Sequence, residues 1–96
     1  MYRQGDVLLK KINELPKNLT EKDKILAYGE ATGHKHQFVS PTVTVLTDGT
    51  TQFCVVEEES VLEHEEHENI QIPAGIYEVV PQVEFDLLEG VRQVMD

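Results

Sequence analysis

The four histidines of this chain fall into two close pairs. One residue separates His34 from His36, and two residues separate His64 from His67. On a β-strand, residues i and i+2 project from the same face, whereas residues i and i+3 converge on one helical turn or in a tight loop. Imidazole nitrogens suit Zn, Ni, Cu and Fe ions. The spacing therefore predicts that the two pairs bind one divalent transition-metal ion, with zinc as the first expectation.

Glutamates stand beside the second pair, at Glu63, Glu65 and Glu66. A carboxylate there could replace one imidazole as a ligand or orient a ligand by a hydrogen bond. Four protein ligands would close the coordination shell of a structural site. Three ligands and a water would leave a reactive position, with Glu65 or Glu66 as the general base. Both alternatives stay open, and so does the question of enzymatic activity. Asp6 and Glu30 are further carboxylates that the sequence cannot place.

Residues 57–68 hold seven glutamates and no basic residue. Such a negative field attracts cations and favours the protonated form of histidine, so we expect it to raise the pKa of the nearby imidazoles. A metal ion must displace those protons before it binds. Any metal affinity should therefore fall at low pH.

The formal net charge of −10 on 96 residues bears on the choice of partner. Nucleic acids and anionic membranes are disfavoured, because phosphate binding needs clustered Lys and Arg. Cations and basic protein surfaces are favoured. A second interpretation is therefore an acidic accessory protein that binds and inhibits a basic protein partner. A third is a metal-free hydrolase that uses paired histidines as acid and base.

The length predicts a single domain over residues 1–96, with 86–96 as a frayed or helical tail. Cys54 is the only cysteine, which excludes an internal disulfide and fits a reducing cytoplasm. The first residues lack an apolar signal core, and no apolar run approaches the roughly 20 residues that cross a bilayer. We expect a cytoplasmic protein whose oligomeric state is undetermined, with a dimer as one alternative.

Short runs rich in Val, Ile, Leu and Thr alternate with turn residues along the chain, and residues 13–23 form a polar loop. This pattern predicts an all-β domain, a small barrel or sandwich of about seven or eight short strands. For residues 57–68, a strand through Val61 and Leu62 and one helical turn are both compatible with the sequence. The other expected strands lie at 7–12, 25–28, 34–38, 42–46, 51–56, 70–72 and 76–80.

The segments 42–46 and 51–56 are rich in β-branched residues and flank Asp48-Gly49. This combination predicts an antiparallel hairpin. Cys54 lies in the second strand between apolar neighbours, so we expect a buried thiol that reacts slowly.

Four segments resemble those of a group of small bacterial and phage proteins with no assigned activity. They are residues 2–9, the GHxH segment around 29–36, the HEEH segment around 62–67, and 72–77. The resemblance implies that the two histidine pairs belong together.

A looser resemblance is to cupins, small β-barrels that hold a metal ion. Their HxH and PxG motifs are echoed by His34, His36, Pro73 and Gly75. The glutamate expected after HxH and the histidine expected after PxG are both missing. The resemblance therefore implies a metal ion in a β-scaffold and no cupin catalysis.

Overall fold

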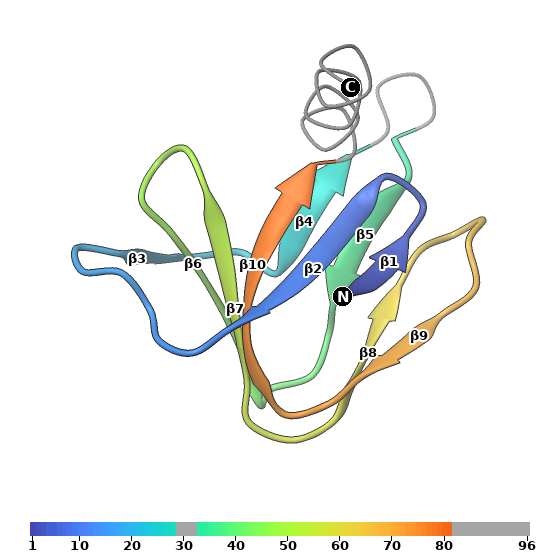
Figure 1. Ribbon diagram of the computed structural model, residues 1–96. Coiled ribbons are helices and arrows are strands. Elements are labelled where there is room, and N and C mark those ends of the chain that lie inside the picture. Colours follow the sequence, from blue (N-terminus) through green and yellow to red (C-terminus); the bar gives the residue numbers. More distant parts are fainter. Residues whose placement is uncertain (29–32, 82–96) are drawn as a thin grey trace, which may run out of the picture.

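The computed structural model describes residues 1–28 and 33–81, and all regular secondary structure within these ranges is β. Ten strands form two antiparallel sheets (Figure 1). The first sheet has the order β1 (Tyr2–Gln4), β2 (Val7–Ile12), β10 (Gly75–Pro81), β7 (Gln52–Val56), β6 (Val43–Thr47), β3 (Thr20–Lys22). The second has the order β4 (Ile25–Tyr28), β5 (Lys35–Phe38), β8 (Ser60–Glu63), β9 (Ile70–Ile72). Neither sheet closes into a barrel, so the all-β expectation is confirmed as a sandwich-like fold.

The hydrophobic core lies between the two sheets. One cluster of buried side chains joins the two sheets, and its members include Leu9 and Tyr77 of the six-stranded sheet and Phe38 and Leu62 of the four-stranded sheet. Each of these four residues is at most 1% exposed. Alternate residues face this core where the strands are central, as in the burial of Val43 and Val45 in β6 and of Tyr77 and Val79 in β10. Each large apolar side chain buried in this way stabilises the fold by about 1.5–3 kcal/mol. Phe38 and Leu62 thereby fix β5 and β8, the two strands that adjoin the histidines.

The expected hairpin is confirmed. Strands β6 and β7 pair antiparallel in unbroken register from Val43↔Val56 to Thr47↔Gln52. Oδ1 of Asp48 accepts the backbone N–H groups of Thr50 and Thr51 at 2.9 and 2.8 Å. Gly49 has φ = 98°, a left-handed conformation that glycine adopts without steric cost.

Two strands were not expected from the sequence. Strand β1 pairs with β2, and β3 pairs with β6 inside the segment 13–23 that was expected to be a loop. Each has three residues, mostly polar (Tyr2-Arg3-Gln4 and Thr20-Glu21-Lys22), without the alternation of apolar residues that marks the equally short strand at 70–72. The open choice at 57–68 is settled as strand β8, followed by a turn through the second histidine pair. The expected tail at 86–96 lies outside the described residues.

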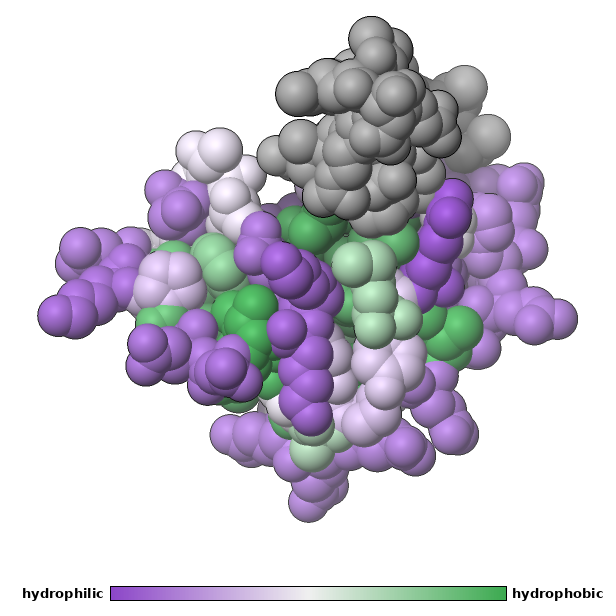
Figure 2. All heavy atoms as spheres, in the orientation of Figure 1, coloured by the Kyte–Doolittle hydropathy of each residue, from purple (hydrophilic) through white to green (hydrophobic). Residues whose placement is uncertain are grey.

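Hydrophilic residues occupy the margins of the face seen in Figure 2, and hydrophobic residues gather toward its middle. Among the described residues, no helix is long and apolar enough to cross a membrane.

Candidate metal centre

The two histidine pairs meet at one end of the four-stranded sheet, where β5 begins and β8 ends. These strands pair antiparallel, with Gln37 opposite Glu63 and Phe38 opposite Leu62. Continued by one residue, this register brings His36 beside His64, although 28 positions separate them in the sequence. His36 is 3% exposed, because it shares the inward face of β5 with Phe38.

Three of the imidazoles can share one ion. Ring centroids are 4.2 Å apart for His36 and His64, 4.5 Å for His64 and His67, and 5.7 Å for His36 and His67. One ligand nitrogen from each of the three lies within 4.8 Å of the other two. Two nitrogens on one tetrahedral zinc lie roughly 3.3 Å apart, given Zn–N bonds of about 2.0–2.1 Å. Small ring movements would therefore bring all three onto an ion.

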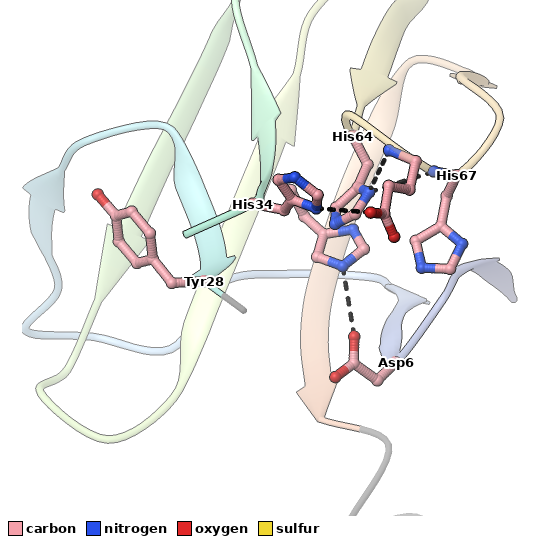
Figure 3. A pocket seen from close by; sticks show the side chains of 7 residues that line it. Asp6, Tyr28, His34, His64 and His67 are labelled. Atoms are coloured by element: carbon pink, nitrogen blue, oxygen red, sulfur yellow. Dashed lines mark hydrogen bonds and ion pairs between the residues drawn. The ribbon is translucent and has the colours of Figure 1, made fainter. Parts of the chain in front are cut away.

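His34 stands at the side of this group. Its ring is 5.7 Å from that of His64, and its ligand atoms cluster with those of His64 and Glu65 in a second group. The four histidines thus lie together (Figure 3), but their ligand atoms form two overlapping groups that share His64.

Gln4 of β1, which is 3% exposed, orients the ring of His36. The side-chain amide of Gln4 donates to the backbone carbonyls of Leu62 at 2.8 Å and Glu68 at 2.9 Å. The Oε1 atom of the same amide can only accept a hydrogen bond, and it lies 2.8 Å from Nδ1 of His36. Nδ1 carries the proton, and Nε2 presents its lone pair to the site. Sequence reasoning missed Gln4, whose only signal is its place before a Gly-Asp turn.

The turn between β1 and β2 forms another wall of the site. Gly5 has φ = 58°, and a Cβ atom built on it would lie 2.5 Å from Nε2 of His67. A side chain at position 5 would therefore push the exposed imidazole of His67 aside, and the left-handed φ also favours glycine there. The next residue, Asp6, places Oδ1 3.3 Å from Nε2 of His36. The structure thus brings Asp6 into the site, whereas Glu30 lies outside the described residues.

The two glutamates proposed as general bases, Glu65 and Glu66, lie beside His34. Oε2 of Glu65 accepts the backbone N–H of Lys35 at 2.8 Å, and this hydrogen bond lowers the pKa of the Glu65 carboxyl group. Oε1 of Glu66 lies 3.3 Å from Nδ1 of His34. The hydrogen bond from Lys35 therefore makes Glu65 a weaker base than an ordinary glutamate.

His64 caps the turn that follows β8. Its Nδ1 accepts the backbone N–H groups of Glu66 at 3.0 Å and His67 at 3.2 Å. These bonds hold the second histidine pair in a tight loop rather than on a helix.

The pKa of His36 departs from the expectation for an acidic setting. Burial lowers this pKa, and the neighbouring His64 lowers it further. The carboxylate of Asp6 raises the pKa of His36, but by less than burial and the neighbouring histidine lower it. The expected rise in pKa is therefore wrong for His36. Burial removes the water that would stabilise the protonated imidazole, and the nearby carboxylates do not compensate fully for that loss.

The histidines open onto a cavity of about 170 Å³, whose other walls are Asp6, Tyr28 and Glu66. Tyr28 stands apart from the histidines across this cavity (Figure 3). A water molecule occupies about 30 Å³ in the liquid. The cavity thus has room for an ion and a small ligand.

No curated protein and no solved structure matches the chain. Residues 3–82 match a family described as a domain of unknown function, DUF8820. The matched span includes all four histidines and the Gln4-Gly5-Asp6 turn. The chain therefore belongs to the DUF8820 family.

Proposed function

We propose that the protein binds a divalent transition-metal ion through His36, His64 and His67, with zinc as the first candidate. The observation that carries the proposal is the mutual approach of their ligand atoms, all within 4.8 Å of one another. Three imidazoles suit zinc, copper, nickel and iron.

The surroundings of the three histidines support a metal site over the simple packing of histidine rings. The Gln4–His36 hydrogen bond fixes one ring nitrogen as donor and leaves the other free, as outer partners of metal ligands do. The carboxylates of Asp6 and Glu66 line the same cavity and would attract a cation.

The cavity favours a reactive site over a closed structural one. Three imidazoles leave coordination positions open, and the space beside them would admit water or a small ligand. Glu66 and His34 border that space and are the candidates for moving a proton there. Glu65 is less suited to this role, because the N–H of Lys35 stabilises its charged form.

Metal analysis of untagged protein tests the proposal, followed by zinc titration near neutral pH. We expect about one ion per chain at the three-histidine centre. His67→Ala should lose the ion and keep the fold, because His67 is exposed. His34→Ala should retain the ion, because His34 lies outside the central group. Binding should weaken at low pH, because protons compete with the ion for the imidazole nitrogens. Burial lowers the pKa of His36, so its nitrogen stays available to a lower pH than that of an ordinary histidine.

A failure of zinc, nickel, iron and copper to bind would contradict this function. The pair formed by His34 and Glu66, 3.3 Å apart, would then favour metal-free acid–base chemistry in the same cavity. Loss of activity in a Glu66→Gln variant, measured on a library of simple esters, would separate that candidate from inert packing.

A further inference from the structure

The hydrogen bonds of Gln4 determine which nitrogen of His36 faces Asp6. The amide group of Gln4 donates to two backbone carbonyls, so its oxygen accepts from Nδ1 of His36. A neutral imidazole carries one proton. The other nitrogen, Nε2, therefore directs a lone pair toward Oδ1 of Asp6, 3.3 Å away.

Two acceptors that face each other repel unless a cation lies between them. A proton shared by a charged imidazole and a carboxylate gives N···O distances of about 2.7–2.9 Å. Two ligands of one tetrahedral ion, each about 2.0–2.2 Å from it, stand roughly 3.3 Å apart. The observed 3.3 Å matches the second arrangement.

We propose that the carboxylate of Asp6 is the fourth protein ligand, so that the centre consists of three imidazoles and one carboxylate. A reactive centre of this kind would take water or a small ligand from the cavity as a fifth ligand, an expansion that zinc sites allow. The proposal rests on the metal binding proposed above. The ring of His67 lies against Gly5, the neighbour of Asp6, and both side chains line the same cavity. Asp6 does not belong to the group whose ligand atoms all lie within 4.8 Å of one another, so its exposed side chain would turn toward the ion to complete the shell. The nearby glutamates are otherwise engaged, Glu65 by the N–H of Lys35 and Glu66 by His34.

Charge and exposure agree with this assignment. Three neutral imidazoles leave the full double charge of a divalent ion uncompensated, and one carboxylate removes half of it. The side chain of Asp6 is 74% exposed, whereas that of His36 is 4% exposed. An incoming ion would therefore meet the carboxylate in water before it reaches the buried imidazole.

Asp6→Asn tests the proposal, with Glu59→Gln as the matched control. Both remove one negative charge from an exposed side chain, but Glu59 precedes β8 and lies at the end of that strand away from His64. Each protein is titrated with Co²⁺ and Zn²⁺ near neutral pH, and its cobalt d–d spectrum is recorded. Loss of an outer partner of a ligand typically costs 10–100-fold in affinity. We expect Asp6→Asn to lose about 100-fold or more and to change the cobalt spectrum, whereas Glu59→Gln changes neither.

The outcomes are distinguishable. If Asp6→Asn binds cobalt with an unchanged spectrum, Asp6 is not a ligand, and this holds even if affinity falls through lost charge. Metal binding by the three histidines would survive that result. If the unsubstituted protein binds neither ion, the proposed function itself fails. Circular dichroism in EDTA checks the fold, and Asp6→Ser, which also suits a turn, replaces Asp6→Asn if that variant unfolds.

Discussion

Gln4 connects three parts of the chain through a single side-chain amide. It donates to backbone carbonyls 58 and 64 residues away and accepts from His36, 32 residues away. All three bonds are between 2.8 and 2.9 Å long. One buried side chain thus sets the protonated nitrogen of His36 and attaches β1 to the four-stranded sheet.

Gln4→Leu should weaken both the fold and the site. Leucine keeps the approximate volume but removes a partner from each of three polar groups, at a cost of about 1–3 kcal/mol for each group left unsatisfied. Because His36 would no longer be oriented, zinc affinity should fall about 10–100-fold. Urea unfolding in EDTA measures the first effect and zinc titration the second.

Gln52→Leu is the control for this substitution. Gln52 also donates to a backbone carbonyl of the opposite sheet, that of Leu26, at 2.8 Å. It has no part in the histidine cluster, and its Oε1 is buried with no hydrogen-bond partner among residues 1–28 and 33–81. We expect a smaller loss of stability than for Gln4→Leu and unchanged zinc affinity. Equal zinc affinity in the two variants would contradict the orienting role of Gln4.

At the scale of elements, the register between β5 and β8 determines which side chains meet. Gln37 lies opposite Glu63, and two residues further along, the N–H of Lys35 reaches the carboxylate of Glu65. A slip of one residue would turn His36 from the inward to the outward face. The buried Phe38 and Leu62 oppose such a slip, because it would expose one of them.

Zinc binding should disturb the turn after β8. Nδ1 of His64 accepts the N–H groups of Glu66 and His67. A metal on Nδ1 would occupy that lone pair, and a metal on Nε2 of the neutral ring would place the proton on Nδ1. Either way both amides lose their acceptor. Their NMR resonances should therefore shift, and their hydrogen exchange should quicken.

The amides of Thr50 and Thr51, held by Asp48 in the β6–β7 turn, provide an internal reference that should not change. If zinc binds while the resonances of Glu66 and His67 stay in place, His64 is not a ligand.

Local pattern was sufficient for some elements and insufficient for others. The hairpin around Asp48-Gly49 follows from alternation and turn chemistry between near neighbours, and alternation also places His36 and Phe38 on one face of their strand. The pairing of β5 with β8 joins segments far apart in the sequence, so no local signal specifies it. In the sequence alone, Gln4 cannot be distinguished from other polar residues. Its role depends on hydrogen bonds to three distant groups that only the fold brings together.

At the scale of the whole molecule, the sandwich places Cys54 at its centre. The residue is 0% exposed, as the sequence predicted, and burial raises the pKa of its thiol to about 12. The charged thiolate is the reactive form, so a neutral buried thiol should be inert at neutral pH. The described structure therefore gives Cys54 a packing role.

The raised pKa of Cys54 predicts a loss of stability in alkali. In the unfolded chain the thiol has a pKa near 8.5, below the folded value of about 12. Its contribution to stability is therefore complete below about pH 8.5. As the pH rises above that value, only the unfolded state loses the proton, and the free energy of unfolding falls. Urea unfolding between about pH 7 and pH 10 measures this slope.

Cys54→Ala isolates the effect from the titration of other groups. This variant lacks the thiol, so its stability should be lower at neutral pH but should depend less on pH above about 8.5. If the free energy of unfolding falls with pH equally steeply in both proteins, or if a thiol reagent labels the native protein rapidly, Cys54 is more accessible than its burial implies.

The short first strand has a consequence for how quickly a bound ion could exchange. Strand β1 is a three-residue strand at the edge of the six-stranded sheet, where β2 is its paired neighbour among the described strands. Short edge segments can open locally at a free energy below that of global unfolding. Such an opening of β1 would break the three hydrogen bonds of Gln4, withdraw Gln4, Gly5 and Asp6 together, and leave the core between the sheets packed. The residence time of the ion would then be set by local opening of β1 rather than by the lifetime of the whole fold.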